Sequence, residues 1–151
     1  MAIRNMTLND ISNVLAIQES LGFQNWNERQ FELEINASFS YAIVFESAIR
    51  HELLGYALFH LLGADSELLS IAVAKDAQHK GIGKKLLENG ISKLDFANGD
   101  CLFLEVREDN INARHFYEKT GFEPFGKRPH YYSDGENAIL YKISNALPKK
   151  H

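Results

Sequence analysis

The sequence predicts an α/β fold of the α+β mixed-sheet type, with helices on both faces of a central sheet. Strands and helices alternate in the middle of the chain, and runs of consecutive strands lie towards its ends. The length of 151 residues, with 45% hydrophobic and 24% charged residues, is typical of one globular domain. We therefore expect a single domain at 1–147, followed by a basic tail at 148–151.

The N-terminal half is predicted to form one strand, two helices and three further strands. Thr7 and Asp10 make a capping-box pattern that starts the first helix, and Asn27 is placed to cap the second. The connection at 47–52 is short enough to join its neighbouring strands as a hairpin. The predicted strands are 2–6, 40–47, 52–62 and 66–74.

The C-terminal half is predicted to continue with two helices and three strands. The first helix spans 82–97 and ends before Gly99, and the second is capped by Asn110 and stopped by Gly121. The predicted strands are 101–106, 122–132 and 137–143. The first of these is almost entirely apolar, which indicates a strand buried on both faces inside the sheet.

Composition and charge exclude several classes of protein. The net charge of -4 and the pI of about 5.8 leave no basic field for general nucleic-acid binding. Cys101 is the only cysteine, so no internal disulfide forms, which fits a reducing compartment; its apolar surroundings predict a buried small residue. No signal-peptide pattern or membrane-length apolar run is present, so we expect a cytoplasmic protein without a membrane partner. The six histidines have no metal-ligand spacing, so no metal site is expected.

The stretch QHKGIGKKLLE at 78–88 places Gly81 and Gly83 between a predicted strand and a helix. Such a turn makes an anion site, because free amides point outward and the helix dipole favours negative charge. Positive charge is added by Lys80, Lys84 and Lys85. The pattern is neither a mononucleotide P-loop nor G-x-G-x-x-G, because position 86 is Leu. The alternative is a tight strand-to-helix connection that binds nothing.

A second stretch, LEVREDNINARHFYEKTGF, carries three polar candidates. Glu105 lies inside an apolar strand, and Asn110 and Tyr117 are seven residues apart, so they share one helix face. Taken singly, each has a structural interpretation: a solvated strand residue, a helix cap and a half-buried core aromatic.

Together the two stretches resemble the GNAT superfamily of acyl-CoA-dependent N-acyltransferases. Residues 78–83 match the pattern Q/R-x-x-G-x-G/A. The later pattern N-x-x-A-x-x-x-Y-x-x-x-G-F is matched by Asn110, Ala113, Tyr117, Gly121 and Phe122. The resemblance covers nearly the whole chain and implies a GNAT-like fold, with a mixed, mostly antiparallel sheet flanked by about four helices.

A narrower resemblance is to the RimI-type ribosomal-protein alanine N-acetyltransferases. It rests on the segments SIAVAKDAQHKGIGKKLLE, LFLEVREDN, FYEKTGFEPFGKRPHYYSDGENAILYKI and FQNWNERQF. The subfamily commonly has an acidic residue where Asn137 stands and often Met where Tyr141 stands, and these departures bear on peptide preference. The resemblance implies an acetyltransferase for the N-terminal α-amine of a protein, namely the N-terminal alanine of a small-subunit ribosomal protein.

The same resemblance implies acetyl-CoA as co-substrate. The amides from His79 to Lys84 would bind its pyrophosphate and Gln78 would shape the turn. The backbone at 71–73 would pair with the pantetheine arm like an added strand, and Asn110 would bond the end of that arm. The implied cofactor-binding residues are Ile71, Ala72, Val73, Gln78, His79, Lys80, Gly81, Ile82, Gly83, Lys84, Asn110 and Tyr117.

The implied chemistry is direct acetyl transfer, with Glu105 as general base and Tyr117 as general acid. A free α-amine has a pKa of about 7.7–8.0, so the base has modest work near neutrality. The implied acceptor-lining residues are Phe23, Trp26, Tyr131, Tyr132 and Asp134. Their alternative interpretation is aromatic core and turn residues, since Asp134 and Gly135 make a good hairpin turn by themselves.

Two other functions remain open. One is a GNAT acetyltransferase for a small amine, such as a polyamine, an aminoglycoside or an amino acid. The other is a non-catalytic acyl-CoA-binding module, which predicts loss of the glycine turn or the catalytic tyrosine, although both are present. The oligomeric state is not specified by the sequence, which is compatible with a monomer.

Overall fold

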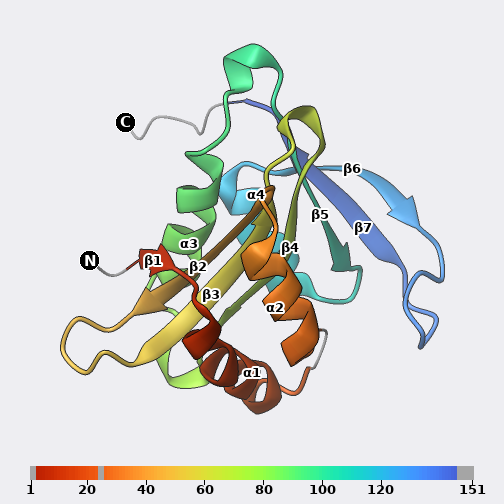
Figure 1. Cartoon of the computed structure of the whole chain (residues 1–151). Helices are drawn as coiled ribbons and strands as arrows, with labels where there is room; N and C mark the ends of the chain where they lie inside the picture. The colour runs from red at the N-terminus through yellow and green to blue at the C-terminus, as the bar shows by residue number, and fades with distance from the viewer. Residues whose placement is uncertain (1–2, 24–25, 146–151) are drawn as a thin grey trace. The chain divides into compact units, whose positions relative to one another are not determined.

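The computed structural model describes residues 3–23 and 26–145 (Figure 1). The hydrogen-bonded strand order is β1-β2-β3-β4-β5-β7-β6. The strands are β1 (Ile3–Asn5), β2 (Ser40–Glu46), β3 (Leu53–His60), β4 (Ser66–Val73), β5 (Leu102–Arg107), β6 (Glu123–Arg128) and β7 (Ala138–Ile143). The α-helices are α1 (Ile11–Ser20), α2 (Glu28–Asn36), α3 (Ile82–Ile91) and α4 (Ile111–Thr120). The predicted mixed α/β fold and its element order are thereby confirmed.

The chain forms two compact units. Of the described residues, the first contains those up to Leu61 together with Leu68–Lys93, and the second contains Leu62–Glu67 together with those from Leu94 to 145. The single domain at 1–147 stays a prediction, and the predicted tail at 148–151 lies outside the described residues.

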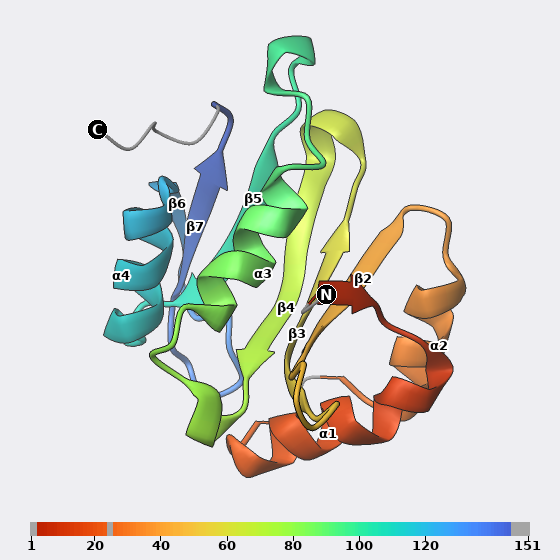
Figure 2. The ribbon, with the colours of Figure 1, turned by 90° about the vertical axis from the view of Figure 1, so that its left-hand side faces the viewer.

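In the first unit, β2 and β3 carry helices on both faces. Tyr56 and Leu58 of β3 belong to a buried cluster with Val14 of α1 and Phe31 of α2. Because side chains alternate along a strand, Phe59 faces the other way. There it meets α3 at Gly90, where a methyl group would overlap the Phe59 ring. Figure 2 shows α3 in front of β3 and β4.

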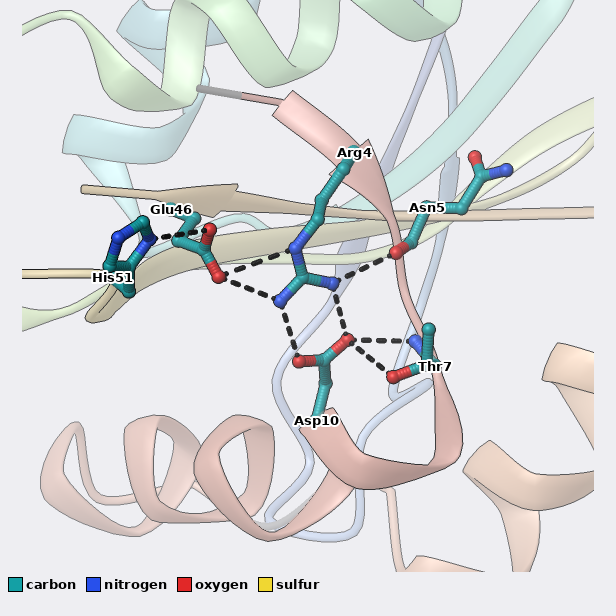
Figure 3. A network of polar contacts seen from close by, with 6 residues as sticks. All are labelled: Arg4, Asn5, Thr7, Asp10, Glu46 and His51. Atoms are coloured by element: carbon teal, nitrogen blue, oxygen red, sulfur yellow. Dashed lines mark hydrogen bonds and ion pairs between the residues drawn. The ribbon is translucent and has the colours of Figure 1, made fainter. Parts of the chain in front are cut away.

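Strand β1 is tied to the rest of the first unit by an ion-pair network (Figure 3). The Arg4 guanidinium on β1 lies 2.8 Å from the Asp10 carboxylate and 2.9 Å from the Glu46 carboxylate on β2. Asp10 also accepts hydrogen bonds from the Thr7 amide at 2.7 Å and the Thr7 hydroxyl at 3.2 Å. One arginine thereby joins the first strand, the start of the helical region and the second strand.

The second unit consists of β5, β6 and β7 with α4. Strand β5 pairs antiparallel with β7, which pairs antiparallel with β6, and Ser66 and Glu67 at the start of β4 pair parallel with β5. Leu102, Leu104 and Val106 of β5 are buried, whereas the residues between them are only half-buried. The prediction that this strand is buried on both faces was therefore wrong.

The predicted helix at 82–97 was too long, because α3 ends at Ile91. The Ser92 hydroxyl donates to the Asn89 carbonyl at 2.6 Å, and the Asp95 carboxylate caps a separate short 3-10 helix, Phe96–Asn98. Local side-chain hydrogen bonds thus replace the continuing helix. Within 3–23 and 26–145, no helix combines the length and hydrophobicity needed to cross a membrane.

Candidate active site

The glycine turn of the first unit has the geometry of an anion-binding helix start. Gly81 precedes α3 with φ of 82°, in the left-handed region that favours glycine, and no side chain caps the helix there. The side-chain amide of Gln78 donates to the Val73 carbonyl at 3.0 Å and so links the turn to the end of β4, while its role toward a cofactor stays a prediction. The amides at the start of α3 have no partners within their own helix.

The surroundings of this turn fit a phosphate group. A Cβ atom at Gly81 would meet no atom within 4 Å, so the backbone is open to close approach. Lys80 and Lys84 are exposed on either side, and the positive end of the ten-residue α3 adds to their field. These features are compatible with the predicted pyrophosphate site of acetyl-CoA, and the contacts of that group with His79, Ile82 and Gly83 stay predictions.

The predicted pantetheine strand is the last part of β4. Ala72 is buried, whereas Ile71 and Val73 are half-buried. Gly55 on β3 lies against this stretch, because a Cβ atom there would come within 3.0 Å of the Ala72 carbonyl oxygen. Pairing of residues 71–73 with a cofactor stays a prediction.

Tyr117 lies on α4 in the second unit and is 8% exposed. Its ring packs against those of Phe122 and Tyr141, with centroids 5.8 Å and 6.4 Å away. Burial raises the pKa of the Tyr117 hydroxyl well above its ordinary value, and the nearby Tyr132 raises it further. Tyr117 is therefore protonated at neutral pH, as a tyrosine at its ordinary pKa of about 10 also is.

Glu105 lies on β5, on the face opposite Tyr117. It pairs in register with Leu140, whereas its neighbour Leu104 pairs with Tyr141, the residue that packs on Tyr117. The structure therefore does not bring the two predicted catalytic side chains into contact. Glu105 instead lines a cavity of about 350 Å³.

The predicted acceptor residues of the second unit lie together after β6. The rings of Tyr131 and Tyr132 are 5.1 Å apart in an edge-to-face arrangement. The interaction of the Tyr131 hydroxyl with the Glu105 carboxylate raises the pKa of Tyr131. Burial is the main cause that raises the pKa of Tyr132, and Glu105 adds to it. Both tyrosines therefore border the candidate base.

Asp134 has a structural role that sequence reasoning missed. Its two carboxylate oxygens accept hydrogen bonds from the Arg107 guanidinium at 2.6 Å and 3.2 Å. This contact lowers the pKa of Asp134, and Arg107 also lies 5.0 Å from the centre of the Tyr132 ring. Arg107 thus fixes the aromatic loop to the end of β5. In the sequence, Arg107 could have been found from its position two residues after Glu105 in LEVR, which places both side chains on the same face of the strand.

Asn110 and the N-terminal candidates have local structural roles. The Asn110 side chain accepts from the Ala113 amide at 3.2 Å and so caps α4, while its contact with the cofactor stays a prediction. Phe23 and Trp26 pack against the core of the first unit. The backbone of Trp26 bonds to both ends of the buried Gln18 amide, which sequence reasoning also missed. Gln24 and Asn25 of the predicted acceptor loop lie outside the described residues.

Comparison with known proteins assigns this fold to a family. Residues 10–122 match the model of the acetyltransferase (GNAT) family. The chain belongs to this family. GNAT proteins are acyltransferases that use acetyl-CoA, so the enzyme class expected from the glycine turn and Tyr117 is confirmed.

Individual relatives agree with this assignment. The chain is 30% identical over 146 residues to a protein of Bacillus subtilis named putative [ribosomal protein bS18]-alanine N-acetyltransferase, covering 95% of each. The crystal structure of the ribosomal-protein-S18-alanine N-acetyltransferase from Escherichia coli superposes with a TM-score of 0.82 at 26% identity, covering 98% of this chain and 96% of the other. A structure of Arabidopsis thaliana NAA60 in complex with acetyl-CoA, 13% identical, has a TM-score of 0.80 over 93% and 96% of the two chains and shows the shared fold.

Proposed function

We propose that this enzyme transfers acetyl from acetyl-CoA to the N-terminal α-amine of a protein. The observation that carries the proposal lies in the second unit, which contains a buried, protonated phenol on α4 and a cavity-lining carboxylate on β5. These are the two kinds of group that acyl transfer to an amine uses, because one proton is taken from the amine and another is given to the thiolate.

The co-substrate supplies an activated acetyl thioester. The backbone amides at the glycine turn would hold its pyrophosphate, and Lys80 and Lys84 would add attraction. Glu105 would accept the proton of the attacking amine, directly or through water. Tyr117, whose hydroxyl is protonated at neutral pH, would donate its proton to the departing sulfur.

The proposed acceptor is the N-terminal alanine of a small-subunit ribosomal protein. Support comes from the names of the Bacillus subtilis and Escherichia coli relatives. Tyr131 and Tyr132 would flank the start of the peptide, with Asp134 holding their loop through Arg107. A ribosomal substrate would place the reaction in the cytoplasm.

The deciding experiment mixes the protein with acetyl-CoA and a short peptide that begins Ala-Arg, and locates the added acetyl group by mass spectrometry. A matched peptide has a blocked amino terminus and a free lysine. Acetylation of the free terminus alone supports the proposal. If neither peptide reacts while polyamines or amino acids release CoA, the enzyme acts on small amines instead.

Glu105→Gln tests the proposed base. Because the acceptor amine is mostly protonated below its pKa of about 7.7–8.0, turnover should fall most at acidic pH. A pH series of initial rates, compared with the parent protein, measures this. An equal loss at every pH would show that Glu105 only positions the acceptor.

A further inference from the structure

Two arginines near the candidate acceptor residues are held very differently. Arg107 on β5 makes four hydrogen bonds with Asp109 and Asp134, at 2.6–3.4 Å. Arg128, at the end of β6, lies 3.6 Å from the Glu105 carboxylate and 5.5 Å from the centre of the Tyr131 ring. The first distance exceeds that of a good hydrogen bond, and the Arg128 side chain is 56% exposed. Arg107 is thus fixed, while Arg128 is a weakly held counter-ion.

The Arg128 guanidinium stands beside the carboxylate that must meet the acceptor amine. Arg128 and Glu105 line the same cavity of about 350 Å³. The other charged or titratable groups around Glu105 are Asp65 and Glu67 in the cavity wall, Arg107 two residues along β5, and Tyr131 and Tyr132. Among the residues that the structure describes, Arg128 is the cation that forms an ion pair with the Glu105 carboxylate.

We propose that Arg128 determines specificity for the charge state of the acceptor, because its guanidinium competes with a protonated amine for Glu105. The inference rests on the proposed function, since it assumes that Glu105 receives the acceptor amine. It assigns a role to a residue on a strand whose residues are all exposed. The acceptor class it selects is an amine of low basicity, such as an α-amine, over the more basic lysine side chain.

The electrostatics give the competition a definite sign. A guanidinium near the bound amine disfavours the ammonium form, so it lowers the pKa of the amine in the complex. The neutral, reactive amine is then populated at lower pH. The same guanidinium weakens binding of the protonated peptide. Arg128 should therefore promote turnover below pH 8 while raising the KM for acceptors that arrive protonated.

The test measures kcat and KM for the Ala-Arg peptide and for the blocked lysine peptide across about pH 6–9.5, in the parent protein and in Arg128→Gln. An exposed ion pair is worth up to about 1 kcal/mol, which corresponds to a shift of roughly 0.2–0.7 pH units. We expect the midpoint of the kcat profile to rise by this amount. At about pH 6.5, KM for the free-terminus peptide should fall roughly two- to threefold, and discrimination against lysine should decrease.

Two variants separate charge from structure. Arg128→Lys keeps the cation and should restore the parent midpoint. Lys127→Gln removes a cation from the neighbouring position of β6, where Lys127 pairs with Glu108 at 2.8 Å instead of Glu105. Its kcat midpoint should match that of the parent. Arg128→Met serves as a second neutral replacement if the Gln variant melts at a lower temperature.

The outcomes distinguish this inference from the proposed function. If the parent acetylates the free terminus and both neutral Arg128 variants keep its kcat midpoint and KM, the competition is overturned and the proposed function stands. An equal midpoint shift in Lys127→Gln also overturns it, because the effect is then general to the charge of β6. If the parent acetylates neither peptide, the proposed function itself fails.

Discussion

The candidate sites of the two compact units consist of different chemical groups, backbone in the first unit and side chains in the second. In the first unit the site is mainly backbone, with a left-handed Gly81 and the free amides of α3. In the second unit it consists of side chains, whose protonation and direction depend on burial and on ion pairs. A backbone site depends on local conformation, whereas a side-chain site depends on groups far apart in the sequence. The two should therefore respond differently to mutation.

The largest expected effect is on the side-chain site. Tyr117→Phe removes the proton that the proposed mechanism gives to the departing thiolate but keeps the ring that packs on Phe122 and Tyr141. We expect turnover to fall roughly 10²-fold, the lower end for a lost general acid, with acetyl-CoA binding nearly unchanged. Steady-state kinetics and calorimetric titration with acetyl-CoA measure the two quantities. Turnover close to that of the parent would remove Tyr117 from the mechanism.

The next effect tests the packing that places the backbone site. Gly90→Ala puts a methyl group of α3 into the Phe59 ring, which is fully buried on β3. Overpacking of this kind costs about 1–3 kcal/mol of the free energy of unfolding. Thermal or urea denaturation should show the loss, and Gly90→Ala combined with Phe59→Leu should recover part of it. Unchanged stability in the single variant would show that α3 moves away freely.

A smaller effect is expected within the turn itself. Gly81→Ala meets no nearby atom, yet it forces alanine into the left-handed region, which costs about 1–2 kcal/mol. If the turn binds acetyl-CoA through its backbone, the added methyl group should weaken that binding as well. Denaturation and titration, carried out on the same preparation, separate the two losses. A stability loss with unchanged affinity would mean that the cofactor does not approach Gly81.

The sequence predicts the backbone-built features better than the side-chain contacts. Asn27 and Asn110 cap their helices as expected, and Gly81 lies in the expected turn before α3, because these features depend on residues within one or two helical turns. The end of α3 was not predicted, because the pattern of apolar residues does not show that Ser92 and Asp95 form local side-chain hydrogen bonds in place of a continuing helix.

The missed parts of the candidate site share a physical cause. Arg107 and Asp134 are 27 residues apart, and Glu105 and Arg128 meet only because β5, β7 and β6 align in register. No local pattern in the sequence encodes such distances. The strand assignment was right for β5. The face on which Glu105 lies could not be predicted, because it depends on which of the two alternating sets of side chains is covered by the rest of the unit.

The smallest expected effect compares two aspartates whose pKa values are both lowered. For Asp10, burial raises the pKa, but hydrogen bonds from Arg4 and the Thr7 amide outweigh it, whereas exposed Asp134 is lowered mainly by Arg107. A carboxyl group with a lowered folded pKa stabilises the protein above its unfolded pKa of about 3.9, and the contribution is lost as pH falls through the folded value.

Asp10→Asn keeps a cap acceptor for Thr7 but loses this charge, so stability at pH 7 should fall by about 1 kcal/mol or less. The difference from the parent should vanish as the pH falls below that folded value. Asp134→Asn, in the exposed loop, should leave the acid melting profile nearly unchanged. Equal profiles for both variants would show that the network in Figure 3 contributes no more than a surface pair.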